Sequence, residues 1–158
     1  MPIYLQIDGI QGDATQQNHK GWMDIQAMHW NVSRNINTLA GSAANREAAE
    51  PVLSEVTLTK TSDSSSVKLF QEACTGRVGK KAVIHLVTTG NPGDTYIEYT
   101  LQSTLIANYT VGSDGDRPIE TITLNFTKLD LKYTPYDDKH QPQSPMVGSY
   151  DLGTTRAA

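Results

Sequence analysis

The stretch Ile119–Tyr136, IETITLNFTKLDLKYTPY, decides the fold of this 158-residue chain. Apolar side chains alternate with polar ones from Ile122 to Phe126 and then from Lys128 to Leu131, the period-two pattern of a strand with one buried face. Such a strand is longer than the usual length of about five or six residues, so we expect it to bend or to serve two sheets of a barrel. No residue in it suggests catalysis, so the stretch indicates the fold and not a reaction.

Length and composition indicate one domain over residues 1–158. Hydrophobic residues make up 37% and charged residues 19%, and the polar remainder is typical of a β protein. The net charge of −4, with no basic run, predicts no nucleic-acid partner. The single cysteine, Cys74, cannot form an internal disulfide. This fits folding in a reducing cytoplasm, although an exported protein without disulfides is also compatible.

The sequence gives no sign of a membrane or secretory segment. No run approaches the roughly 18 apolar residues of a membrane span, so we expect no stable membrane insertion. The opening MPIYLQIDGIQGD has neither the basic region nor the apolar core of a secretory signal. If the protein leaves the cell, we expect it to do so without the general secretory route.

The remaining patterns predict a mainly β fold: a β-barrel of two antiparallel sheets with one short flanking α-helix and a long extended loop. A polar linker over residues 137–145 leads to a C-terminal strand. The other strands are expected at residues 2–8, 22–32, 52–60, 81–88, 95–102, 104–111 and 146–152.

The helix is predicted over residues 66–74, where apolar side chains recur at helical spacing and Gly76 follows. Leu69 and Phe70 are expected to anchor it on the barrel. Cys74 lies on the same stripe, so we interpret it as a small buried side chain and not as a nucleophile.

The long loop over residues 35–51, NINTLAGSAANREAAEP, has no consistent period. Loops of this length inside a compact domain are usually functional or disordered. Three interpretations stay open: a disordered surface loop, an arm that packs on a neighbouring copy, and a lid over a small ligand. The candidate residues for subunit contact are Leu39, Ala43, Ala44, Arg46 and Glu47.

No motif supplies catalytic chemistry, so the sequence predicts no enzyme, no cofactor and no metal. The four histidines have no metal-ligand spacing, and we expect them at the surface or lining the fold. Carboxylates in strands could still meet in the fold as a glycosidase pair, although solvated positions are the simpler expectation. Those carboxylates are Asp24, Glu55, Glu98 and Glu120.

Three segments together resemble the Hcp (haemolysin-coregulated protein) family, the tube subunit of type VI secretion systems. They are VLSEVTLTKTSDSSSVKLFQEACTG at 52–76, GDRPIETITLNFTKLDLKYTPY at 115–136 and SYDL at 149–152. Their order and spacing agree over nearly the whole chain. Val67 stands where members often carry proline, and Ser149-Tyr150 stands where Gly-Trp is frequent.

The resemblance implies a homohexameric ring that stacks head to tail into a hollow tube inside a contractile sheath. It implies as partners other copies of the chain, a VgrG-like spike protein, sheath proteins and secreted effectors. The protein would be cytoplasmic before assembly and then be secreted through the type VI system. The alternatives are a stand-alone β-barrel that binds a small ligand and, more remotely, a carboxylate-based hydrolase.

The strand at residues 22–32 carries the expected effector contact. Met28, Trp30 and Val32 are expected in the core, because burying Trp and Met outweighs burying His and Asn. The opposite face is an ordinary solvated strand face, an outer wall, or the lumen that the resemblance favours. The residues on that face are Ala27, His29 and Asn31.

Overall fold

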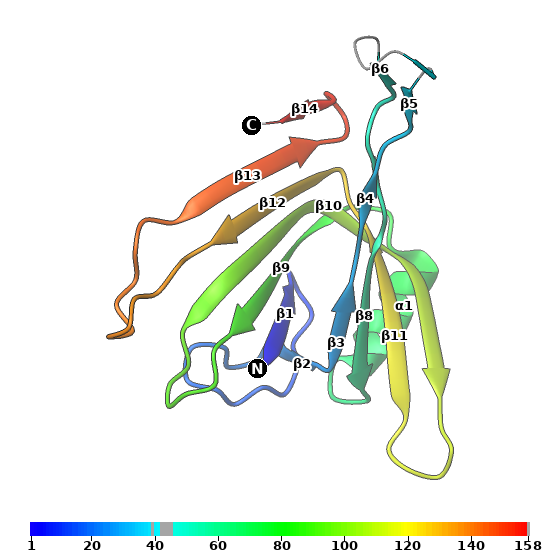
Figure 1. Cartoon of the computed structure of the whole chain (residues 1–158). Coiled ribbons are helices and arrows are strands. Elements are labelled where there is room, and N and C mark those ends of the chain that lie inside the picture. The colour runs from blue at the N-terminus through cyan, green and yellow to red at the C-terminus, as the bar shows by residue number, and fades with distance from the viewer. Residues whose placement is uncertain (39, 42–45, 158) are drawn as a thin grey trace.

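The computed structural model describes residues 1–38, 40–41 and 46–157, and within them it is mainly β with one short helix, α1 Ser66–Thr75 (Figure 1). The strands in chain order are β1 Ile3–Ile7, β2 Met23–Ile25, β3 Ala27–His29, β4 Val32–Ser33, β5 Ile36–Thr38, β6 Arg46–Ala48, β7 Val52–Leu53, β8 Val56–Thr61, β9 Lys80–Val87, β10 Thr95–Gly112, β11 Ile119–Asn125, β12 Lys128–Tyr133, β13 Met146–Asp151 and β14 Arg156–Ala157.

The longest strand, β10, belongs to two sheets. Its first half pairs with β9 and β12, and its second half pairs with β11. The sequence predicts two strands here, whereas the structure has a single strand of 18 residues. Ser103, at the expected boundary, has a left-handed backbone (φ 51°), and the register with β9 shifts between Leu101 and Thr104. The strand therefore changes sheets at an irregularity, where bulged backbone increases twist.

The stretch Ile119–Tyr136 serves both sheets, as expected, but as two strands. β11 pairs with the second half of β10 and β12 with the first half, and Phe126 and Thr127 separate them. Burial alternates along the whole of β11 but only at the start of β12, where Leu129 is buried between half-buried neighbours. The apolar positions change from even to odd numbers at Thr127-Lys128, so the pattern contains the break that the interpretation as one strand overlooked.

The two sheets are antiparallel throughout. One runs in the order β14-β13-β12-β10-β9-β1-β2 and the other in the order β10-β11-β8-β3. β2 continues into β3 through Gln26, whose N–H donates to the Thr59 carbonyl at 2.7 Å. The expected fold class is confirmed, but among the described residues the hydrogen-bonded ladder does not close into a complete barrel.

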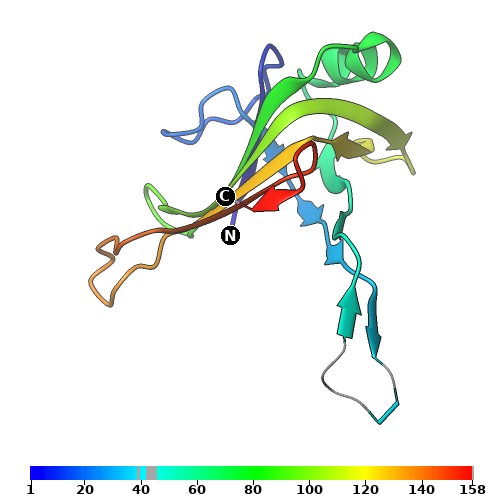
Figure 2. The same cartoon turned by 90° about the horizontal axis from the view of Figure 1, so that it is seen from above.

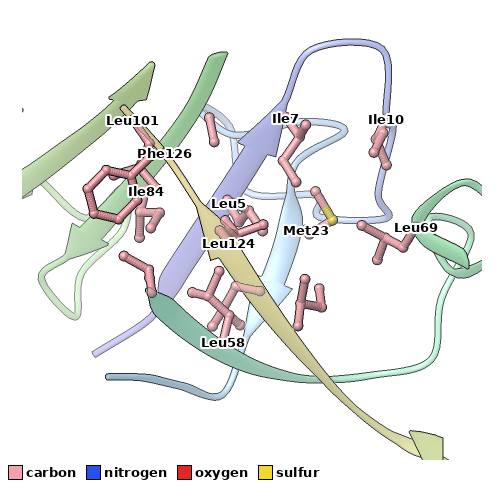
Figure 3. Packing of buried hydrophobic residues seen from close by; sticks show 14 of the residues in the cluster. Leu5, Ile7, Ile10, Met23, Leu58, Leu69, Ile84, Leu101, Leu124 and Phe126 are labelled. Atoms are coloured by element: carbon pink, nitrogen blue, oxygen red, sulfur yellow. The ribbon is translucent and has the colours of Figure 1, made fainter. Parts of the chain in front are cut away.

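The core lies between the two sheets and is filled by side chains from both (Figure 3). Leu5 and Leu101 come from the first sheet, Leu58 and Leu124 from the second, and all four are fully buried. Burying a side chain of this size contributes about 1.5–3 kcal/mol. The inward positions of β8 and β11 follow the alternation read from the sequence.

A second, smaller apolar cluster lies on the opposite face of the first sheet. The segment of residues 8–22, here called the covering loop, brings Ala14 and Trp22 against Tyr4 of β1 and Val87 of β9. Gly12 is required here, since a Cβ at this position would lie 2.5 Å from the Trp22 carbonyl oxygen. The covering loop is thus packed on the sheet.

The helix packs through a different face from the one expected. Leu69 is fully buried, whereas Phe70 is 60% exposed and Cys74 is also exposed. Neighbouring helical residues point about 100° apart, so burying Leu69 turns Phe70 outward. Leu69 is an anchor as expected, and the expectation that Phe70 and Cys74 are buried is wrong for the single chain.

Candidate functional surfaces

The segment expected as an extended loop forms a two-stranded arm, defined here as residues 32–53. β4 pairs with β7 and β5 with β6, and the arm projects away from the sheets (Figures 1 and 2). Its base is held by Ser54, whose N–H donates to the Asn31 carbonyl at 2.8 Å while its Oγ accepts from the Asn31 N–H at 2.7 Å. The hydrogen bonds thus give the arm a defined direction.

The five candidate contact residues of the arm can be located only in part. Leu39, Ala43 and Ala44 lie outside the described residues. Arg46 and Glu47 lie in β6, where their backbones pair with Thr38 and Asn37. Their role in subunit contact stays a prediction.

An apolar groove of about 210 Å³ lies where the arm meets the first sheet. Val32 and Val52 at the base of the arm are 55% and 65% exposed. The Tyr150 hydroxyl donates to the Glu50 carboxylate at 3.4 Å and connects β13 to the segment of the arm between β6 and β7. The residues that line the groove are Trp30, Val32, Pro51, Leu53, Leu129, Leu131, Gly148, Ser149 and Tyr150.

The strand expected at residues 22–32 is divided into β2, β3 and β4, and its two faces largely follow the prediction. Met28 and Trp30 pack against the core, whereas His29 and Asn31 are exposed and Ala27 is half-buried. Val32 does not reach the core, because the chain leaves the sheet for the arm at this point. Whether Ala27, His29 and Asn31 face a lumen stays a prediction.

A buried ion cluster that was not predicted from the sequence joins the second sheet to the helix. Lys60 of β8 and Glu120 of β11 are directly opposite each other, and Lys60 Nζ donates to Glu120 Oε1 at 2.9 Å and to Asp63 Oδ1 at 2.8 Å. Ser62 and Ser66 donate to Glu120 Oε2 at 2.7 and 2.5 Å. The signal was present, since Lys60 and Glu120 occupy inward positions of their alternating strands.

The donors around Glu120 decide its protonation. Burial raises the pKa of Glu120, but the hydrogen bonds from Ser62, Ser66 and Lys60 outweigh burial and hold the pKa below its ordinary value. Burial and then a hydrogen bond to the Glu120 carboxylate raise the pKa of Tyr109 to about 12. The expected solvated position is therefore wrong for Glu120, which is a structural ion.

The other carboxylates and the histidines occupy varied positions. Asp24 and Glu55 are exposed, and Glu98 Oε1 lies 3.2 Å from His85 Nε2. His19, expected at the surface or lining the fold, is buried against the ring of Tyr4. In the described part of the chain no group of three or more histidine, cysteine or acidic residues could hold a metal ion. Nor does any described helix have the length and hydrophobicity needed to cross a membrane.

Comparison with known proteins defines the class. The family described as "Type VI secretion system effector, Hcp" matches residues 4–133, which is most of the chain. The chain therefore belongs to the Hcp family of type VI secretion proteins. The protein hcp1 of Pseudomonas aeruginosa is 25% identical over 138 residues, covering 84% of this chain and 83% of that protein.

Solved structures share the fold over almost the full length. A type six secretion system protein superposes with a TM-score of 0.92 at 22% identity, with 99% of both chains covered. Hcp1 from Salmonella typhimurium gives 0.81 at 21% identity, covering 99% of this chain and 98% of that one. Hcp1 from Flavobacterium johnsoniae gives 0.60 at 10% identity, covering 96% and 99%. The fold is thus shared at sequence identities of 10–22%.

Proposed function

We propose that this chain is the tube subunit of a type VI secretion system and assembles into stacked hexameric rings that carry effectors and the spike into target cells. Family membership over residues 4–133 supports a role in that system. The proposal places the protein in the cytoplasm before assembly and outside the cell after export, with VgrG-like spike and sheath proteins as further partners. No catalytic role is part of it.

The observation that carries ring assembly is the projecting arm with an apolar groove at its base. A two-stranded ribbon is marginally stable alone, and the exposed apolar side chains Val32, Ile36 and Val52 favour contact with another surface. Arm and sheet are different surfaces of one chain. Contact between different surfaces is heterologous, and it closes into a ring when the rotation between copies divides a full turn evenly without translation.

The test is the native mass of the purified full chain. A hexamer of the 17.3 kDa subunit has a mass of about 104 kDa, whereas the ligand-binding and hydrolase alternatives predict no ring. Deletion of residues 38–49 should give monomers with a near-native β circular dichroism spectrum. A ring that survives the deletion would mean that the arm is not the joint within a ring and would assign it to stacking.

A pair of point variants separates the arm from general surface effects. Val32 at the base of the arm and Val111 in β10 are 55% and 54% exposed. Val32→Asp should shift the native mass toward the monomer, because it places a charge against an apolar partner. Val111→Asp, matched in exposure and chemistry, should leave the ring intact. Equal loss of the ring in both variants would contradict a joint centred on the arm.

A further inference from the structure

Two histidines from distant parts of the sequence meet beneath the covering loop. His19 of the loop and His85 of β9 approach with Nε2 and Nδ1 only 2.9 Å apart. His19 also stacks on Tyr4, with ring centroids 4.5 Å apart, and Trp22 contacts both imidazoles. We call these two residues the histidine pair. None of the surfaces assigned to assembly or cargo includes them.

The tautomer of His19 is fixed by its neighbours in the loop. Gln16 Oε1 lies 2.6 Å from His19 Nδ1 and accepts from the backbone N–H of Asn18 at 2.9 Å. Turning the Gln16 amide around would place its N–H groups against the Asn18 N–H, so Oε1 must stay where it is. An accepting oxygen requires a proton on His19 Nδ1. His19 Nε2 can then carry a proton only if the imidazole is protonated on both nitrogens and is therefore positively charged.

The contacts along this chain need one more hydrogen than two neutral imidazoles can supply. Three contacts need a hydrogen: Gln16 to His19, His19 to His85, and His85 Nε2 to Glu98 Oε1, which lies 3.2 Å away. Two neutral imidazoles supply only two hydrogens. His85 Nε2 is indeed a buried nitrogen without a hydrogen-bond partner, since the approach of Glu98 is close but not aligned.

We propose that the histidine pair is a shared proton site that binds one proton, and not two, and in that state fastens the covering loop to the sheet through Glu98. One additional proton satisfies all three contacts and places an imidazolium beside a carboxylate, which is a charge-assisted bond. A second proton would make both rings cations, with two N–H groups facing each other across a nitrogen–nitrogen distance of 2.9 Å. Without the proton, the lone pair of His85 Nε2 faces a carboxylate.

The charged and titratable groups around the pair agree with a single proton. One row across the first sheet places Asp24 of β2 opposite Tyr4, Tyr4 opposite His85, His85 opposite Glu98, and Glu98 opposite Lys132 of β12. Glu98 is the anion that contacts the pair directly. Burial and then the neighbouring His85 charge lower the pKa of His19, which keeps this ring neutral while its partner is charged.

Exchange of the imidazole C2 hydrogen for deuterium, followed by mass spectrometry of histidine-containing peptides, tests this on the full chain in any state of assembly. The exchange rate reports the protonation of each ring. The proposal requires that only one of the two rings gains a proton, so as the pH falls the exchange of one ring should change while His19 keeps the rate of a neutral imidazole; the exposed His29 and His140 serve as reference residues. Proton uptake by both His19 and His85 would overturn the proposal.

The variant Glu98→Gln removes the anion and keeps the size of the side chain. We expect the proton uptake of the pair to move to lower pH, and the backbone amides of residues 12–22 to lose protection after correction for the intrinsic pH dependence of exchange. Glu55→Gln, at an exposed glutamate outside the pair, is the matched control and should change neither quantity. Unchanged titration in Glu98→Gln would also overturn the proposal.

Discussion

Two neighbouring residues of α1 contribute unequally to the stability of the folded chain, and a pair of alanine variants should reveal the difference. Leu69 is fully buried and Phe70 is 60% exposed. Leu69→Ala should reduce the free energy of unfolding by about 2–5 kcal/mol, because it leaves a cavity in the core. Phe70→Ala should change it by no more than about 0.5 kcal/mol.

Thermal unfolding at one fixed protein concentration measures both variants, since the proposed assembly would make the midpoint depend on concentration. An equal loss in the two variants would show that Phe70 is covered in the assembled protein. That result would place the outer face of the helix at a subunit joint.

His29 is the position where the proposed lumen can be tested. Its side chain is exposed on β3, so His29→Arg should fold and form rings, and six added bulky charges should weaken retention of an effector. Co-purification of an effector with the rings measures this. His140→Arg makes the same chemical change in the 137–145 linker and should leave retention unchanged. Rings that fail to form in His29→Arg would place His29 at a joint.

At the scale of elements, the ion cluster couples β8, β11 and the start of α1. Removing one partner leaves an uncompensated buried charge, so Lys60→Met should cost about 3–5 kcal/mol of stability. The double variant Lys60→Met/Glu120→Leu should recover part of this loss, because it removes the buried Glu120 charge, while Asp63 still lacks its cation. Chemical denaturation of the two single variants and the double variant gives the coupling energy. A double variant no better than Lys60→Met would contradict this account.

The same cluster predicts a loss of stability in acid. The pKa of Glu120 is lower in the folded chain than its ordinary value of 4.5, so the unfolded chain binds the proton more readily. This contribution is complete above the unfolded pKa and disappears as the pH falls through the folded one. The unfolding midpoint should therefore decrease below about pH 4.5, and by less in the double variant. An identical decrease in both proteins would assign acid sensitivity to other groups.

How far the sequence predicts these elements depends on the range of the interactions. Alternation in β8 and β11 identified the inward faces because a half-buried strand has a strict period of two. The boundary inside residues 95–112 was misplaced, since Ser103 interrupts the pattern but not the strand. The helix was found and its face was not, because the outward stripe through Phe70 is as apolar as the inward one.

The candidate surfaces were predictable to a smaller extent. An irregular, polar segment at residues 35–51 indicated an excursion, but pairing within it depends on registers such as Ile36 with Ala48, which no period reveals. The ion cluster required Lys60 to face Glu120 across 60 residues of sequence. The histidine pair is 66 residues apart. Contacts of this kind are set by the topology and not by local pattern.

At the scale of the whole molecule, the shared strand β10 has a consequence for how the protein is made. β1 pairs with β9, joining Ile3 to Leu86, and β10 then connects this sheet to strands that end at Tyr133. Pairing over such separations slows folding, because distant segments must meet before they gain stability. During synthesis the first sheet cannot form completely until residues far downstream have been added to the chain. In the proposed assembly, only a chain that has been synthesised almost to its end can present the folded surfaces that a ring requires.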